Sequence, residues 1–95
     1  MGQNRRIGKT ATKVTERDGM THVRYHSTDV VSFDSSKVIL RTDGWKTATT
    51  KARMNQTANE YNLPFSVFQD KGQWFVRVMN KTLKFENDSI EIKFR

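Results

Sequence analysis

The stretch Thr-Ala-Thr-Thr-Lys-Ala-Arg-Met-Asn-Gln-Thr-Ala-Asn-Glu-Tyr-Asn, residues 47–62, decides the fold because it is the only helical candidate in the chain. Met54, Ala58 and Tyr61 fall at positions i, i+4 and i+7, which places them on one face of a helix. Two small residues lie beside this apolar stripe, and polar residues fill the remaining surface. The small residues are Ala48 and Ala52, and the polar residues are Lys51, Arg53, Gln56, Thr57 and Glu60.

Both ends of this helix carry termination signals. Thr49 or Thr50 can cap the start, because a threonine hydroxyl satisfies an unpaired amide of the first turn. Pro64 sets the end, because the residue before a proline avoids the helical conformation. We therefore expect one amphipathic helix within Thr47–Asn62.

Outside the helix, apolar and polar residues alternate with a period of two, which is typical of half-buried strands. Turn residues such as Asp18-Gly19 separate pairs of strands. The alternation is clearest near the end of the sequence, where Ile90, Ile92 and Phe94 are expected to point inward. The expected strands are Lys9–Glu16, Met20–Ser27, Val30–Phe33, Lys37–Arg41, Phe65–Gln69, Gln73–Met79, Thr82–Glu86 and Ser89–Phe94.

These elements follow the order β-β-β-β-α-β-β-β-β. The short links favour antiparallel hairpins, so the sequence predicts an α+β fold in which a meander carries the single helix on one face. The two halves of the chain could also each form a small sheet. Residues 1–8 lack aromatic side chains and are expected to form a flexible basic arm, which leaves 9–95 as one domain.

The chain is strongly basic, because 17 Lys and Arg residues against 10 Asp and Glu residues give its 95 residues a net charge of +7. Such a field attracts polyanions, nucleic acid first among them, and acidic proteins as well. The positive charge is densest in residues 1–18, where Arg5, Arg6 and Lys9 are candidates for phosphate contacts. No cysteine is present, which excludes disulfides and thiolate metal sites. No apolar run reaches the ~18–20 residues that span a bilayer, so we expect a cytoplasmic protein without membrane contact.

A second concentration of charge surrounds the start of the helix, where Lys46, Lys51 and Arg53 lie near the hydroxyls of Thr49 and Thr50. Helix N-termini bind phosphate well, because their unpaired amides and the helix dipole both favour negative charge. Cations there oppose the dipole, and an external anion would relieve this unfavourable placement. The alternative is a threonine-rich cap with solvated cations. No glycine-rich phosphate loop is present, so binding of a nucleoside triphosphate is not expected.

Aromatic and histidine residues add further contact candidates. Trp45 lies in a break of the pattern, where its ring could stack on a base amid basic residues. Trp74 shares a strand face with apolar residues and is expected in the core. His26 and Arg24 belong to one polar stripe of a strand, which faces either solvent or a partner.

A catalytic role for the histidines has little support in the sequence. His26 with Asp29 or Asp34 would suggest a small hydrolase or nuclease, but no Ser-His-Asp order, paired carboxylates or His/Asp metal cluster accompanies it. His22 and His26 would lie roughly 13 Å apart on a strand that rises ~3.3 Å per residue, which is too far for one metal ion. We therefore expect no enzyme activity, no metal and no cofactor.

Two strings in the sequence resemble a group of short proteins encoded by tailed phages and prophages. Residues 25–34 contain a His-x-Thr-x-Val-Val-x-Phe strand, and residues 44–56 contain a Gly-Trp-x-Thr-x-Thr-Thr-x-x-Arg-Met-Asn helix start. The resemblance covers about residues 23–79 and includes a closing hairpin with the aromatic pair Trp74-Phe75. It implies a small accessory protein of the host cytoplasm that regulates DNA or blocks host defences, and it implies no catalytic residues. It draws attention to His26, Thr28, Trp45, Thr47, Thr49, Thr50 and Arg53.

The leading hypothesis is therefore a phage accessory protein that binds DNA or RNA through phosphate contacts. The alternative is an inhibitor that occupies the surface of an acidic host defence complex. An edge strand of so small a sheet could pair with a second copy, which allows a homodimer. The candidate contact residues are Arg5, Arg6, Lys9, Arg24, His26, Trp45, Lys46, Thr49, Thr50, Lys51 and Arg53.

Overall fold

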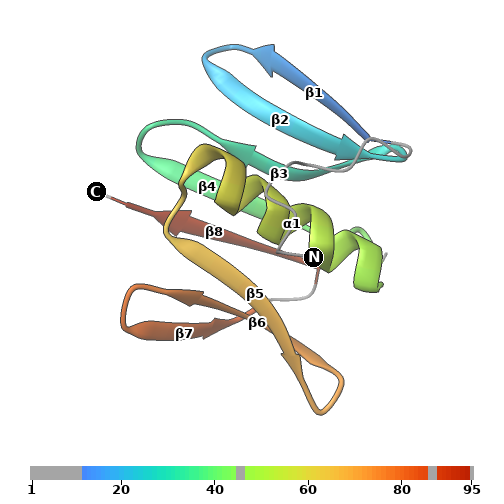
Figure 1. Cartoon of the computed structure of the whole chain (residues 1–95), viewed down its shortest axis with the longest axis vertical. Helices are drawn as coiled ribbons and strands as arrows, with labels where there is room; N and C mark the ends of the chain where they lie inside the picture. The colour runs from blue at the N-terminus through green and yellow to red at the C-terminus, as the bar shows by residue number, and fades with distance from the viewer. Residues whose placement is uncertain (1–11, 45–46, 86–87, 95) are drawn as a thin grey trace, which may run out of the picture.

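A computed structural model describes residues 12–44, 47–85 and 88–94 of the chain, so the expected arm at 1–8 lies outside the described residues. Strands and a single helix follow one another in the predicted order (Figure 1). The elements are β1 (Thr12–Arg17), β2 (Met20–Tyr25), β3 (Thr28–Phe33), β4 (Lys37–Arg41), α1 (Ala48–Tyr61), β5 (Phe65–Asp70), β6 (Gln73–Val78), β7 (Lys81–Lys84) and β8 (Ser89–Lys93). The predicted α+β fold, with antiparallel strands and a helix packed against a sheet, is confirmed.

The first sheet contains five antiparallel strands in the order β1-β2-β3-β4-β8. Its first four strands are consecutive hairpins, whereas β8 returns from the far end of the sequence to pair with β4. Ile92 lies opposite Val38 and both are buried, so β8 extends the apolar face as its alternation predicted. Thr42 donates its backbone N–H to the Asp88 carbonyl at 2.7 Å, which holds the start of β8 beside the end of β4.

The second sheet contains β5, β6 and β7 in sequence order, and in Figure 1 it lies below the first sheet. The helix lies in front of the first sheet in that view and leads directly into β5. Asn55 of the helix covers the edge of β5, because its side chain accepts the Val67 N–H at 2.7 Å and donates to the Val67 carbonyl at 3.0 Å. The asparagine thus makes the hydrogen bonds that another strand would make, so this edge is protected from further pairing.

The helix cap lies two or three residues before the caps predicted from the sequence. Thr47 is the cap, in place of Thr49 or Thr50, and its Oγ1 accepts the Thr50 N–H at 3.2 Å. Asn62 follows the last turn in the left-handed conformation (φ 56°), which asparagine tolerates better than most residues. The helix therefore ends just before the proline that was expected to stop it.

The buried face of the helix is more polar than its pattern predicted. Met54 is fully buried as expected, but Thr57 and Arg53, which were expected on the surface, are buried too. The Thr57 hydroxyl donates to the Arg53 carbonyl at 2.8 Å, so its burial leaves no unpaired polar group. Tyr61, expected in the apolar stripe, is exposed at the helix end and rests against Phe33, with ring centroids 4.9 Å apart.

One core joins the helix to both sheets. Trp74 is 3% exposed within it, which confirms the packing role expected for this residue. The buried apolar residues are Val23, Val30, Val31, Phe33, Val38, Leu40, Met54, Ala58, Phe65, Val67, Trp74, Val76, Val78, Phe85 and Ile92.

No helix in the described part of the chain has the length and apolar character needed to cross a membrane.

Candidate functional site

The five-stranded sheet has one face covered by the helix and one face turned away from it. Tyr25 marks the helix side, because the guanidinium of Arg53 lies over its ring at 5.5 Å. Arg24, the preceding residue of β2, points to the opposite side, which we call the outer face. Residues in direct register with Arg24 share that face, namely Lys13 of β1 and Asp29 of β3.

A β-bulge brings Asp29 to the outer face. Val23 pairs with Val31 and Arg24 pairs with Asp29, so β3 has one extra residue, Val30, at this point. Without the extra residue, the alternation that runs back from Val31 would turn Asp29 toward the helix. The bulge therefore re-aims one carboxylate toward the arginines of the neighbouring strands.

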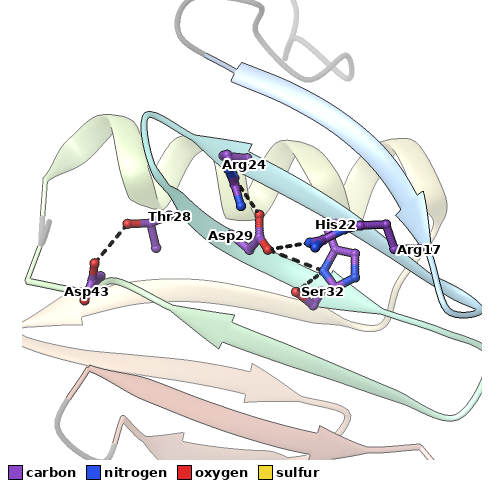
Figure 2. Close-up of polar contacts among 7 residues, drawn as sticks. All are labelled: Arg17, His22, Arg24, Thr28, Asp29, Ser32 and Asp43. Atoms are coloured by element: carbon purple, nitrogen blue, oxygen red, sulfur yellow. Dashed lines mark hydrogen bonds and ion pairs between the residues drawn. The ribbon is translucent and has the colours of Figure 1, made fainter.

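Asp29 is the centre of a charged cluster on the outer face (Figure 2). Arg24 Nε donates to Asp29 Oδ1 at 3.1 Å, and Arg17 Nη2 donates to Asp29 Oδ2 at 3.0 Å. The arginines reach the carboxylate from two sides, and their side chains stay about half exposed while that of Asp29 is mostly buried. One carboxylate thus fixes two cationic groups and leaves both accessible to a ligand.

His22 and Ser32 complete the cluster, but their geometry is not that of a catalytic triad. His22 Nδ1 lies 2.8 Å from Ser32 Oγ and 3.7 Å from Asp29 Oδ2. In a triad the serine and the carboxylate contact different ring nitrogens, so that the imidazole relays a proton between them. Here one nitrogen faces both groups, and Ser32 is only 1% exposed. The histidine beside Asp29 is His22, whereas His26, the residue considered for a hydrolase, lies in the turn after β2 with a φ of 59°.

Cations outnumber carboxylates on the strands of the outer face. Two pairs of cations lie directly opposite each other on neighbouring strands, Lys13 with Arg24 and Lys37 with Lys93. Like charges in direct register destabilise a sheet, so this arrangement costs stability unless an anion lies between them. Among the described strand residues, the cations of this face are Lys13, Arg17, Arg24, Lys37, Arg41 and Lys93, and the carboxylates are Asp29 and Glu91.

Two depressions adjoin these cations, and they differ in charge. The smaller, of about 220 Å³, has a described lining without carboxylates: Lys13, Thr15, Arg17 and Arg24. The larger, of about 400 Å³, is bordered by Arg24 and Arg41 but also by Asp29, Asp43 and Asp88. Carboxylates repel a phosphate, so the smaller hollow is the better anion site of the two.

The start of the helix forms a cap that uses its own groups. Thr50 is fully buried, and its amide is already bound by the cap residue. Arg53 is 8% exposed and donates through Nε to Thr12 Oγ1 at 2.8 Å, which ties the helix to β1. Lys51 donates to a glutamine of β5 at 2.9 Å, and Thr49 is half-buried. These contacts are those of a helix cap, and the phosphate site that the sequence suggested at this helix start stays a prediction.

The contact residues expected from the sequence therefore lie in different places. Arg24 is on the outer face, His26 is exposed in the turn after β2, and the helix-start residues belong to the opposite side of the sheet. The remaining candidates lie outside the described residues: Arg5, Arg6, Lys9, Trp45 and Lys46.

Most cations of the outer face were not singled out from the sequence. Alternation assigns alternate residues of one strand to opposite faces, but the face that each strand shares with its neighbours depends on pairing and register. The opposed pair of Lys37 and Lys93 becomes visible only when β8 is known to lie beside β4. In the described residues, no group of three or more His, Asp or Glu side chains could hold a metal ion.

Comparison with known proteins links the chain to phages. The family described as Kyanoviridae Gp96 protein matches residues 1–93. No curated protein and no solved structure matches the chain. The phage origin expected from the resemblance is thus confirmed at the level of the family, which says nothing about the two motifs themselves.

Proposed function

Because the chain belongs to the Kyanoviridae Gp96 protein family and is therefore a phage protein, we propose that it binds nucleic acid through phosphate contacts on the outer face. The observation that carries this proposal is the pair of like-charged contacts, Lys13 opposite Arg24 and Lys37 opposite Lys93. A phosphate between two such cations would replace repulsion with charge-assisted hydrogen bonds. Nucleic acid presents phosphates in a regular series, so one strand could neutralise several cations of the sheet.

The Asp29 cluster supports the proposal because it pre-organises two arginines. Asp29 uses one nitrogen of Arg24 and one of Arg17, and each guanidinium carries five N–H donors. Both side chains line the smaller hollow beside Lys13 and Thr15. A side chain that is already held in place loses less conformational entropy when it binds a ligand.

The candidates outside the described residues remain part of this proposal as additional contacts. Four of them are cations that would add to the attraction of phosphates, and the fifth is a tryptophan that would stack on a base. They are Arg5, Arg6, Lys9, Lys46 and Trp45. The host cytoplasm is the compartment in which we expect this binding.

Gel shift or fluorescence anisotropy on single- and double-stranded DNA and RNA tests the proposal. Each neutralised phosphate releases counterions, so the affinity should fall steeply between ~50 and ~200 mM salt. The absence of any shift on all of these nucleic acids at micromolar protein would contradict nucleic-acid binding.

Neutral variants identify the face that binds. Lys13→Gln and Arg24→Gln each remove one cation from the smaller hollow, and each should reduce the slope of log affinity against log salt by about 1. Lys71→Gln is the matched control, because Lys71 is an exposed lysine in the turn between β5 and β6 of the other sheet. An equal loss in all three variants would show that net charge drives binding without a contribution from this face.

A second candidate function, inhibition of a host defence complex by protein contact, is favoured by one feature. Met79, expected at the end of a strand, lies instead in the turn between β6 and β7, where it is 69% exposed with a φ of 55°. Folding does not favour a long apolar side chain in this conformation, so its presence suggests contact with a partner. Met79 lines a groove of about 410 Å³ together with Leu83 and Ile92.

Affinity purification of the tagged protein from phage-infected or expressing cells, with nuclease treatment, tests this second candidate. A single stoichiometric protein partner that is lost in Met79→Gly would support it, since glycine keeps the turn and removes the side chain. Retention of that partner by the variant would exclude the groove as its docking site. Recovery of no host protein would contradict the second candidate as a whole.

A further inference from the structure

The three-stranded sheet has a solvent-facing side of its own, and this side carries an aromatic pair. Phe68 of β5 lies opposite Phe75 of β6, with ring centroids 5.5 Å apart and ring planes 18° from parallel. The neighbouring Trp74 points into the core, so Phe75 points the other way. Both phenylalanines are half-buried, whereas the other side chains of this face are exposed: Ser66, Asp70, Gln73, Arg77, Thr82 and Lys84.

Cations flank the aromatic pair. The guanidinium of Arg77 lies over one face of the Phe68 ring, with its carbon 5.6 Å from the ring centroid. Lys84 of β7 lies directly opposite Phe75 on the side away from Phe68. Among the described strand residues of this face, Asp70 at the hairpin end is the sole carboxylate. The face therefore combines two rings with positive charge on either side.

Strand formation does not by itself require rings at these positions. The opposite side of the same strands already supplies the core with Phe65, Val67, Trp74, Val76 and Val78. On a solvent-facing side, β-branched or polar residues support a strand without exposing apolar surface. Rings that face solvent beside cations suit a partner that offers flat π-faces together with negative charge.

We propose that Phe68 and Phe75 form a stacking platform for unpaired bases, with Arg77 and Lys84 contacting the adjoining phosphates. This inference rests on the nucleic-acid binding proposed above and deepens it by naming a single strand as the partner. Unpaired bases can lie on aromatic rings because every base has a π-face, whereas the bases of a duplex are stacked on one another. The platform would accordingly tolerate any base sequence.

Fluorescence anisotropy with a labelled oligothymidylate and with a duplex of mixed sequence tests the platform. The double variant Phe68→Leu with Phe75→Leu keeps apolar bulk and removes both π-faces. Its affinity for oligothymidylate should fall about tenfold or more, and its affinity for the duplex should not change. Its salt slope should equal that of the wild type, because no phosphate contact is lost. Phe75→Tyr is the matched control, since it retains a ring and should retain binding.

Two outcomes would overturn the platform and leave nucleic-acid binding in place. The first is a wild type that binds the duplex but not oligothymidylate, and the second is a leucine variant that binds oligothymidylate as tightly as the wild type. A wild type that binds no nucleic acid would overturn both proposals. Lys13→Gln should weaken the binding of oligothymidylate and of the duplex alike. Loss of duplex binding therefore distinguishes a change on the outer face from a change on the platform.

Photo-crosslinking supplies a second measurement that needs no variant. Ultraviolet irradiation of the wild-type protein with oligothymidylate, followed by mass spectrometry, should attach nucleotides to peptides that contain Phe68 or Phe75. Attachment confined to peptides of β1 and β2 would overturn the platform. Circular dichroism of the leucine variant shows whether its fold is intact, and if it is not, the crosslinked peptides decide the question.

Discussion

The outer face of the first sheet and the aromatic face of the second offer different chemistry to the same kind of partner. Among its described strand residues, the first carries six cations and no Phe, Tyr or Trp. The second carries two phenylalanines between two cations. A field of charge attracts any polyanion but does not distinguish paired from unpaired bases, whereas rings contact only bases that have left their stack. The first sheet can therefore supply affinity for nucleic acid, and the second sheet can supply the preference for single-stranded over double-stranded nucleic acid.

The largest change in stability is expected for a core substitution, which tests whether both faces depend on one shared core. Met54 is fully buried, and its helix contacts strands of both sheets. Met54→Ala should lower the free energy of unfolding by about 2–5 kcal/mol, because it removes buried apolar contacts and leaves a cavity. In urea denaturation, circular dichroism and tryptophan fluorescence should report one coincident transition. Two separated transitions would show that the sheets unfold independently.

A smaller effect should be confined to the second sheet. Asn55→Ala leaves the N–H and the carbonyl of Val67 without their helix partner, which should cost about 1–3 kcal/mol. Amide hydrogen exchange should accelerate in β5 and β6 and stay unchanged in β2 and β3. Asn59→Ala is the matched control, because Asn59 is an exposed asparagine of the same helix. Equal acceleration in both sheets would argue against an edge contact that serves the second sheet alone.

Removing one of the opposed cations of the first sheet should raise the stability of the fold and lower its affinity for nucleic acid. Lys13→Gln removes repulsion toward Arg24 and should raise the free energy of unfolding by up to about 0.5 kcal/mol. The same variant should bind nucleic acid more weakly, as argued above. Thermal unfolding of Lys13→Gln, with Lys71→Gln as the control, checks the sign of the change in stability. A loss of stability in Lys13→Gln would mean that the pair is not repulsive.

The smallest expected effect is a loss of stability in acid that arises in the turn between β3 and β4. Asp34 Oδ1 accepts the Ser36 N–H at 2.8 Å, the Ser36 hydroxyl at 2.9 Å and the Lys37 N–H at 3.0 Å. These bonds, the Ser36 amide first, hold the pKa of Asp34 below its usual value of 3.8. A carboxylate whose pKa is lower in the folded than in the unfolded protein stabilises the fold at any pH above its pKa in the unfolded chain. This contribution is lost as the pH falls through its pKa in the folded protein.

Thermal unfolding of the wild type and of Asp34→Asn across the acid range measures this contribution. The difference between the two midpoints should be largest above pH ~4 and should shrink as the pH falls below it. A midpoint difference that grows on acidification would contradict the role assigned to Asp34.

Elements that rest on local periodicity could be predicted from the sequence. The alternation around Trp74 and Ile92 was sufficient to place both residues in the core. The helix was also predicted, but its buried polar residues were not. Thr57 can be buried because its hydroxyl bonds to a backbone carbonyl, and Arg53 can be buried because it bonds to Thr12 of a distant strand. Hydrogen bonds between distant residues leave no trace in a hydrophobic pattern.

The candidate site was harder to predict because it depends on pairing between strands. Arg24 was identified on a polar strand face, but the carboxylate that holds it reaches that face only through the bulge at Val30. The charge at the helix start was visible in the sequence, whereas the hydrogen bond from Thr50 to Thr47 that caps the helix was not. Phe68 and Phe75 likewise form a pair only because β5 and β6 meet in this register.

The pairing of β8 with β4 has a consequence for synthesis of the protein on the ribosome. Thr42 and Asp88, whose hydrogen bonds hold these strands together, are 46 positions apart in the sequence. The first four strands can pair as they emerge, but the edge of β4 waits for its partner until most of the chain has been translated. Contacts of such long sequence separation slow folding. During that delay β4 exposes a row of unpaired backbone groups, so crowded polysomes are the setting in which neighbouring nascent chains could pair wrongly.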